Sequence, residues 1–160
     1  MKPYAYRGLR ERVGLTSEEY ASIYKAWKRM LNRCYDPNNA SFYRYDGRIN
    51  VCTEWKYSFE NFLLWSVKNG WAPGLSLDRI DNDGDYEPSN CRWATWKQQS
   101  RNRSSCIYLT HDGVTRVLSE WCEIYGVPFY LAHNRLIRGC TDFETLFRKI
   151  DLRSGGDLYY

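Results

Sequence analysis

Apolar residues recur every third or fourth position over residues 20–31, which is the spacing of one face of an α-helix. These positions are Tyr20, Ile23, Tyr24, Trp27, Met30 and Leu31. Thr16 or Ser17, followed by Glu19, suits an N-cap, and the run 36–39 (Asp-Pro-Asn-Asn) breaks the helix after it. The pattern therefore predicts an amphipathic helix before residue 36.

The flanking pattern is less regular. Residues 1–17 suggest a basic, loosely ordered arm, because Pro3, Gly8 and Gly14 interrupt any helix there. Alternating residues predict a short strand at Ile49–Cys52. The apolar residues Phe59, Phe62, Leu63 and Trp65 then predict a second helix, which ends at Asn69-Gly70.

Residues 77–103 predict a strand, a loop, a strand and a helix in quick succession. Asp78 and Arg79 fall in the first strand, Asn90 opens the second, and Gln99 and Asn102 follow on the polar helix. This layout places a carboxylate, amides and basic side chains where they could surround one divalent metal and a phosphate. It is the only constellation in the chain that suggests a particular chemistry.

The pattern after residue 105 changes again. Residues 107–117 predict a β-hairpin with an Asp112-Gly113 turn. Residues 118–125 and 129–138, separated by Gly126-Val127-Pro128, predict a helix-turn-helix, with Ser119 capping its first helix and Pro128 beginning its second. Residues 142–150 predict a final helix. We therefore expect an α+β chain in four parts: an arm (1–17), a core (18–105), a hairpin and helix-turn-helix module (106–153), and a flexible tail (154–160).

Composition supports a folded protein. Apolar residues make up 43% of the chain and aromatic residues 17%, which argues against disorder. No apolar run approaches the ~20 residues of a membrane span, and residues 1–4 lack the apolar stretch of a signal peptide. We therefore expect a cytoplasmic protein that does not associate with membranes.

The net charge of +4 is unevenly distributed. Residues 1–33 hold eight Lys and Arg against three Glu, and Lys97, Arg101 and Arg103 form a smaller acid-free cluster. Such patches suit a polyanion. For Lys25, Lys28 and Arg29, a solvated helix face is an equally good interpretation.

Six cysteines occur without any Cys-x-x-Cys pair. Cys34, Cys52 and Cys91 lie in three blocks that we expect to pack together, so a structural Zn²⁺ site is one alternative. Zinc ligands usually come in close pairs, and buried free thiols are therefore the preferred interpretation.

The segment 77–103 resembles the HNH nuclease core, also called the ββα-metal or His-Me finger, and most closely its branch among phage homing endonucleases. The motif blocks that carry the resemblance are Asp78-Arg79, the loop Asn82-Asp83-Gly84, the run 90–95 (Asn-Cys-Arg-Trp-Ala-Thr), and Gln99 or Asn102 on the helix. Upstream blocks such as Trp27–Met30 and Tyr45–Ile49 are also similar to phage relatives, and the resemblance covers roughly residues 20–150. It implies a small ββα-metal core with N-terminal helices and a C-terminal DNA-binding module.

The resemblance implies a sequence-recognising DNA endonuclease that uses one Mg²⁺ or Mn²⁺ ion. The metal would be held by Asp78 with Gln99 or Asn102, and Asn90 would orient the strand and loop, either as a catalytic residue or as a turn cap. For Asp78, an ion pair with a neighbouring Arg is the simpler alternative. Backbone phosphates would contact Arg92, Lys97, Arg101 and Arg103. In the helix-turn-helix, Tyr130, His133, Asn134 and Arg138 would meet the major groove of double-stranded DNA.

One position departs from the family. Arg79 stands where the family has its activating His, and Arg stays protonated and cannot act as a general base. Arg79 could instead bind the scissile phosphate, with Tyr45, Tyr86 or the metal activating the attacking water. His111 and His133 do not occupy the family's catalytic position. The alternative function is a DNA-binding regulator that has lost the chemistry, and a weaker one is a protein-binding antagonist. Both a monomer and a homodimer are compatible with the sequence.

Overall fold

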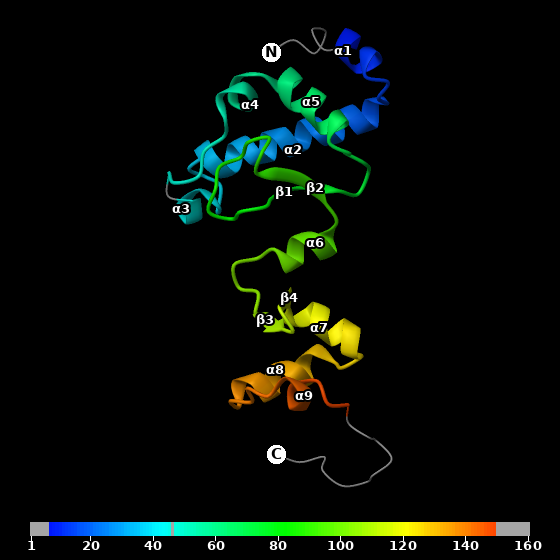
Figure 1. The fold of residues 1–160 in the computed structure, drawn as a ribbon. Coiled ribbons are helices and arrows are strands. Elements are labelled where there is room, and N and C mark those ends of the chain that lie inside the picture. Colours follow the sequence, from blue (N-terminus) through cyan, green and yellow to red (C-terminus); the bar gives the residue numbers. More distant parts are fainter. Residues whose placement is uncertain (1–6, 46, 150–160) are drawn as a thin grey trace. The chain divides into compact units, whose positions relative to one another are not determined.

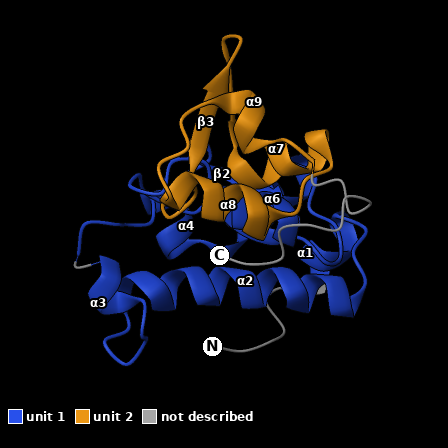
Figure 2. Cartoon of the chain, turned by 90° about the horizontal axis from the view of Figure 1, so that it is seen from below, with its two compact units in different colours: residues 1–103 blue, residues 104–160 orange. Residues whose placement is uncertain are grey.

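The computed structural model describes residues 7–45 and 47–149 of the 160-residue chain. It is a mixed α+β structure in which the described residues form two separate antiparallel β-hairpins together with helices of 4 to 19 residues (Figure 1). The chain forms two compact units, residues 1–103 and residues 104–160 (Figure 2). Among the described residues, no helix is long and apolar enough to cross a membrane.

The first unit contains most of the helices and one hairpin. Its elements are α1 (Arg7–Arg12), α2 (Ser17–Tyr35), α3 (Phe42–Tyr45), α4 (Thr53–Tyr57), α5 (Phe59–Lys68), β1 (Ser76–Arg79), β2 (Cys91–Ala94) and α6 (Trp96–Arg101). Helix α2 packs against α3 and α5, and α6 packs against β2. The strand–loop–strand–helix order expected for residues 77–103 is confirmed.

Helix α2 confirms the helix that the apolar spacing predicts. Thr16 is its N-cap and forms a capping box with Glu19, in which each side chain accepts from the other residue's backbone N–H. Ile23, Met30 and Cys34 lie on its buried face, and the helix ends at Asp36.

Helix α1 shows that the prediction of a loosely ordered arm is wrong for residues 7–12. Gly8 lies in the first turn of this helix, where it breaks nothing, and Gly14 follows the helix with a φ of +68°. Leu9 is only 6% exposed and belongs to the core of the unit. Burial of this one apolar side chain gives the segment a reason to fold. Residues 1–6 lie outside the described residues.

The expected strand Ile49–Cys52 is a single β-bridge between Val51 and Tyr86. Helix α4 begins at Thr53, directly after it, so there is no room for a longer ladder. Helix α5 confirms the second predicted helix: Ser58 caps it, and it ends at Asn69, followed by Gly70 with a φ of +77°.

The core of the first unit is rich in aromatic rings. Trp55 and Phe62 are at most 1% exposed, and their rings meet edge to face with centroids 5.1 Å apart. The ring of Phe62 also lies 6.1 Å from that of Trp93 on β2. Edge-to-face pairs add to the free energy gained from burial. This core fixes the hairpin β1–β2 against the helices.

The second unit contains β3 (Tyr108–His111), β4 (Val114–Val117), α7 (Leu118–Tyr125), α8 (Phe129–Ile137) and α9 (Phe143–Leu146). The predicted hairpin is confirmed, since Asp112 and Gly113 have φ values of +49° and +75°. Two successive positive φ values are the signature of a type I′ turn, which matches the twist of the strands.

The two helices α7 and α8 are also confirmed, with changes at their ends. Gly126 ends α7 in the left-handed conformation at a φ of +64°. Ser119 does not cap α7, because Val117 occupies the N-cap position there. Pro128 is the N-cap of α8 rather than its first residue. The final helix is shorter than residues 142–150: it ends at Leu146, and Asp142 caps it by accepting from the N–H of Thr145.

Candidate functional site

A pocket of about 110 Å³ opens beside the end of β1 within the first unit. It brings together side chains from α2, α3, the hairpin β1–β2 and the end of α6. The residues that line it are Arg33, Tyr45, Leu77, Asp78, Arg79, Asn82, Tyr86, Gln99, Asn102 and Arg103. Four predicted site residues, Asp78, Arg79, Gln99 and Asn102, therefore share one pocket with predicted DNA-contacting Arg103.

The register of the hairpin determines the partner of Asp78. Asp78 lies directly opposite Arg92 on β2, and Nε of Arg92 donates to Oδ2 of Asp78 at 3.0 Å. The Asp78 side chain is 6% exposed, whereas that of Arg92 is 41% exposed. Asp78 therefore has the arginine partner that the simpler interpretation expects, and Arg92 bonds to it through Nε while its side chain stays 41% exposed.

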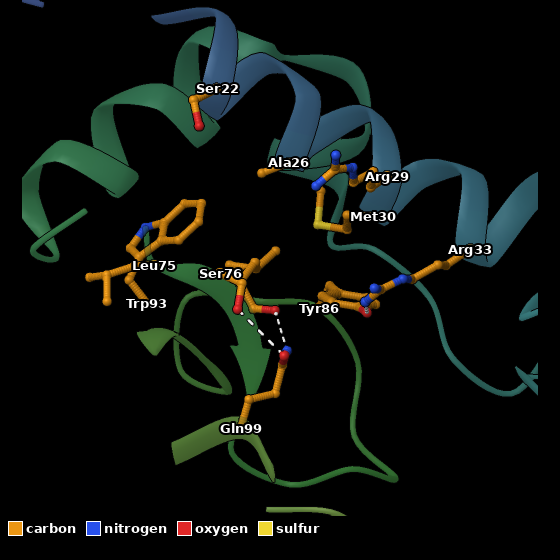
Figure 3. A pocket seen from close by; sticks show the side chains of 11 residues that line it. Ser22, Ala26, Arg29, Met30, Arg33, Leu75, Ser76, Tyr86, Trp93 and Gln99 are labelled. Carbon is orange, nitrogen blue, oxygen red and sulfur yellow. Dashed lines mark hydrogen bonds between the residues drawn. The ribbon is translucent and has the colours of Figure 1, made fainter. Parts of the chain in front are cut away.

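The two amide side chains at the end of α6, Asn102 and Gln99, have different hydrogen-bond partners. Nδ2 of Asn102, the C-cap of α6, donates to Oδ2 of Asp78 at 3.4 Å and to the carbonyl of Arg79. Nε2 of Gln99 donates instead to the carbonyl of Leu77 at 3.4 Å, and Oε1 accepts from Ser76 (Figure 3). The structure thus brings Asn102, rather than Gln99, into contact with Asp78.

Arg79 lies between two aromatic rings. Its guanidinium is 4.9 Å from the ring centroid of Tyr45 and 4.8 Å from that of Tyr86, and Nη1 donates to the carbonyl of Gly84 at 2.6 Å. Arg79 is only 8% exposed. The ring faces and the carbonyl compensate for the desolvation of the positive charge. The pocket therefore has a fixed cation in its wall.

A hydroxyl network holds the tyrosines of this pocket. The hydroxyl groups of Tyr45 and Tyr86 are 3.0 Å apart, and Nη1 of Arg33 donates to the Tyr86 hydroxyl at 3.4 Å. Burial, and then the neighbouring Tyr45, raise the pKa of Tyr86 above its ordinary value. Burial therefore makes ionisation of the Tyr86 hydroxyl less favourable than that of an exposed tyrosine.

Two residues of the pocket escaped the sequence analysis. Arg33 belonged to the basic N-terminal region and to an upstream block of the resemblance, and Asn82 belonged to its loop block, but neither was given a site role. Asn82 donates to the carbonyl of Asn102, which ties the loop to the end of α6. Arg33 lies one helical turn after Arg29 on α2, and this spacing is the one signal in the sequence that could have marked it.

Asn90 holds the loop between β1 and β2. Its Oδ1 accepts from the N–H of Asp81 at 2.8 Å, and its Nδ2 donates to the carbonyls of Asp81 and Asp85 at 3.1 and 2.9 Å. A Cβ on Gly84 would lie 2.6 Å from Nδ2 of Asn90, so any side chain there would displace the Asn90 amide from its bonds to the loop. The geometry is that of a turn cap.

The cysteines do not assemble a metal site. Cys34 and Cys91 are buried thiols, and burial raises the pKa of Cys34 to about 11 and that of Cys91 to about 12. Within residues 7–45 and 47–149, no group of three or more His, Cys, Asp or Glu side chains is arranged to hold a metal. The structure therefore gives no support to zinc at Cys34, Cys52 and Cys91.

Helix α8 of the second unit carries the other predicted site residues. Tyr130, Asn134 and Arg138 are exposed and follow one another at four-residue intervals, so they share one face that extends to the end of the helix. His133 is half-buried and stacks on Phe129 at 5.4 Å between ring centroids. His111 stacks on Phe143 at 3.8 Å and so packs within its own unit.

The remaining basic residues predicted to contact DNA lie on α6. Lys97 is exposed and Arg101 is half-buried, and neither lines the pocket.

Comparisons of the chain with protein-family models, with curated proteins and with solved structures find no match.

Proposed function

We propose that this protein is an HNH-type DNA endonuclease that hydrolyses a phosphodiester with one divalent metal ion, Mg²⁺ or Mn²⁺. The observation that carries the proposal is the pocket at the end of β1. Asp78 and Asn102 are in contact there, and Arg33, Arg79 and Arg103 line the same pocket. A carboxylate, an amide and three cations around one small pocket match the needs of a metal-bound phosphate.

The donor set fits Mg²⁺ in one specific way. Mg²⁺ keeps several waters and binds proteins through one or two carboxylates together with substrate phosphates. Asp78 supplies the single carboxylate of the pocket, and rotation of the Asn102 amide about its last side-chain bond would turn its oxygen toward Asp78. The bound metal would polarise the phosphate and stabilise the leaving oxygen.

The chain's own residues would then handle the phosphate. Three arginines against one carboxylate leave the lining of the pocket with a net positive charge. Arg79 cannot move far, because Gly84 and two tyrosine rings hold it, so it presents a preorganised charge to a phosphate oxygen. The Tyr86 hydroxyl, whose pKa burial raises, is placed by Tyr45 and Arg33 at the wall of this pocket, where it would donate a hydrogen bond to a phosphate oxygen.

Sequence recognition is assigned to the helix-turn-helix of the second unit. The exposed face of α8 presents an amide and a guanidinium at Asn134 and Arg138, the groups that pair with adenine and guanine in the major groove. Tyr130 on the same face is 66% exposed. An exposed aromatic ring in this position suits contact with a base or a sugar.

A DNA-binding regulator is the second candidate, and two contacts favour it. The Asp78 carboxylate is already paired with Arg92, and the Arg79 guanidinium already bonds the Gly84 carbonyl. By the motif resemblance, Arg79 also stands where the HNH family has its activating His. A protein with these contacts would bind DNA through the same pocket and leave it intact.

The test compares wild type with Asp78→Asn, which keeps the shape of the side chain and its hydrogen bond with Arg92. Both proteins are incubated with genomic DNA in Mg²⁺, Mn²⁺ or EDTA, and the DNA ends are sequenced. The proposal predicts discrete, metal-dependent ends that Asp78→Asn loses while it still binds DNA. Intact DNA in a salt-sensitive complex with both proteins would establish the regulator instead.

A further inference from the structure

A second pocket, of about 120 Å³, lies between α2 and the hairpin β1–β2 in the first unit (Figure 3). No role assigned so far uses it. Its lining residues are Ser22, Ala26, Arg29, Met30, Arg33, Leu75, Ser76, Leu77, Tyr86, Trp93 and Gln99. Arg33, Leu77, Tyr86 and Gln99 also line the pocket that contains Asp78, so the two pockets are neighbours along β1.

The α2 side of this second pocket is positively charged. Arg29 and Arg33 lie one helical turn apart, about 6 Å along the helix axis. The residues that line the pocket include two arginines and no Asp or Glu. Arg33 faces both pockets, so it links this charged edge to the phosphate site at Arg79. Such a row of guanidinium groups can follow successive phosphates of one nucleic-acid strand.

The wall on the hairpin side is apolar and ends in an amide. Leu75 and Trp93 provide this wall, and Met30 closes it from α2 (Figure 3). At the far end, the two hydrogen bonds of Gln99, to Ser76 and to the carbonyl of Leu77, are both 3.4 Å long. Bonds of this length are weak. The Gln99 amide can therefore exchange them for donors and acceptors of a ligand.

The size of the second pocket limits what can enter it. Since one water-sized position takes about 10–15 Å³, its volume holds on the order of ten such positions. That space suits a single sugar or base and excludes a base pair. The second pocket thus offers two arginines for a phosphate, an apolar wall for a sugar or base ring, and the Gln99 amide for the polar atoms of that ring.

We infer that this pocket is a subsite for the nucleotide next to the phosphate bound at Arg79, on the same DNA strand. The inference rests on the proposed function, because it needs a DNA strand in the neighbouring pocket. Arg29 and Arg33 hold the flanking phosphate, the sugar or base lies against Trp93 and Leu75, and Gln99 contacts its polar edge. Arg29 thus belongs to a binding site rather than to a solvated helix face.

The test uses two variants of the full chain and one matched control. Arg29→Gln removes a charge that lines the pocket. Ser22→Phe fills the pocket from an exposed position on α2 without changing any charge. Lys25→Gln is the control, since Lys25 is exposed on the same helix and does not line the pocket. DNA affinity is measured by fluorescence anisotropy over a range of salt concentrations.

Arg29→Gln should make the plot of log affinity against log salt less steep by about 0.9 for duplex DNA, or about 0.7 for a single strand. Ser22→Phe should weaken binding at least tenfold with the slope unchanged, and Lys25→Gln should match wild type. Wild-type affinity from Ser22→Phe, or an unchanged slope from Arg29→Gln, overturns the subsite while DNA binding itself stands. Failure of wild type to bind any DNA overturns the proposed function and the subsite with it.

Discussion

The two units of the chain differ in whether they bury charged side chains. The first unit buries Asp78 and Arg79 next to each other in β1, at 5% and 8% exposure. The described residues of the second unit bury only apolar side chains, and α8 carries its polar groups on an exposed face. Burying charges costs free energy that an apolar pair would not cost. Within the described residues, buried charges therefore occur only in the first unit, where they line the candidate pocket, whereas the second unit has its charges on exposed or half-buried side chains.

The largest expected effect tests whether the two units have independent cores. Phe62, fully buried in the first unit, and Leu118, 1% exposed in the second, belong to separate clusters. Phe62→Ala should destabilise the first unit by about 3–5 kcal/mol, and Leu118→Ala the second by about 2–5 kcal/mol. Hydrogen exchange resolved along the chain measures each unit. Loss of protection in both units from either substitution would show one shared core.

Alkaline pH should next affect the first unit more than the second, because burial raises the pKa of Cys34, Cys52 and Cys91 in the first unit and of Cys122 in the second. Burial raises the pKa of Cys34 and Cys91 from 9.0 to about 11 and about 12, so the folded state holds these protons more tightly than the unfolded state does. The stabilisation is complete below pH 9 and is lost as pH rises toward pH 12, at up to about 1.4 kcal/mol per pH unit and group.

Urea denaturation between pH 7 and pH 11 measures this loss for the first unit. Cys91→Ala removes one of the groups whose pKa burial raises, so its stability should fall less steeply with pH than that of wild type. Parallel pH profiles for the two proteins would contradict the assignment to Cys91.

A smaller effect is expected at the loop that shapes the pocket. Asn90→Ala leaves the N–H of Asp81 and the carbonyls of Asp81 and Asp85 without their partner, which should cost about 1–3 kcal/mol. Asn38→Ala is the matched control, because its amide donates only within an exposed turn, and it should cost under about 0.5 kcal/mol. Equal costs in thermal unfolding would mean that Asn90 does not hold the loop.

The smallest effect on stability is expected on α8. Asn134→Ala should change the free energy of unfolding by less than about 0.5 kcal/mol, because Asn134 is exposed. It should weaken specific DNA binding by about 1–3 kcal/mol and leave the salt dependence unchanged, as a base contact does. Competition binding against random DNA measures both quantities. Unchanged specificity would remove α8 from recognition.

Local signals predicted most of the secondary structure. The capping box at Thr16 and Glu19, the Asp112-Gly113 turn and the Gly126 helix end each follow from a few adjacent residues, and all three are present. The predictions that were wrong depended on tertiary contacts or on the elements that follow, which a local pattern does not show. Helix α1 exists because Leu9 reaches the core, and the bridge at Val51 ends early because α4 follows at once.

The sequence predicted which site residues lie close together when they are near one another in the chain, but not when they come from distant elements. Asp78, Arg79 and Asn102 lie within one supersecondary unit, so their proximity follows from the strand–loop–strand–helix order. Arg33 comes from a helix more than forty residues earlier, and no spacing rule connects it to Arg79. The choice between Gln99 and Asn102 likewise depended on which amide the end of α6 turns toward Asp78.

The central claim is that Asp78 and Asn102 hold a divalent metal at the end of β1 when DNA is bound. Mn²⁺ titrated into the ¹⁵N-labelled protein–DNA complex tests it directly, because a paramagnetic ion broadens the signals of nearby amides. The account predicts selective broadening of the amides of residues 77–80 and 102–103 in wild type, and none of it in Asp78→Asn. Uniform broadening, or the same pattern in both proteins, would contradict the metal site and leave a protein that binds DNA without cutting it.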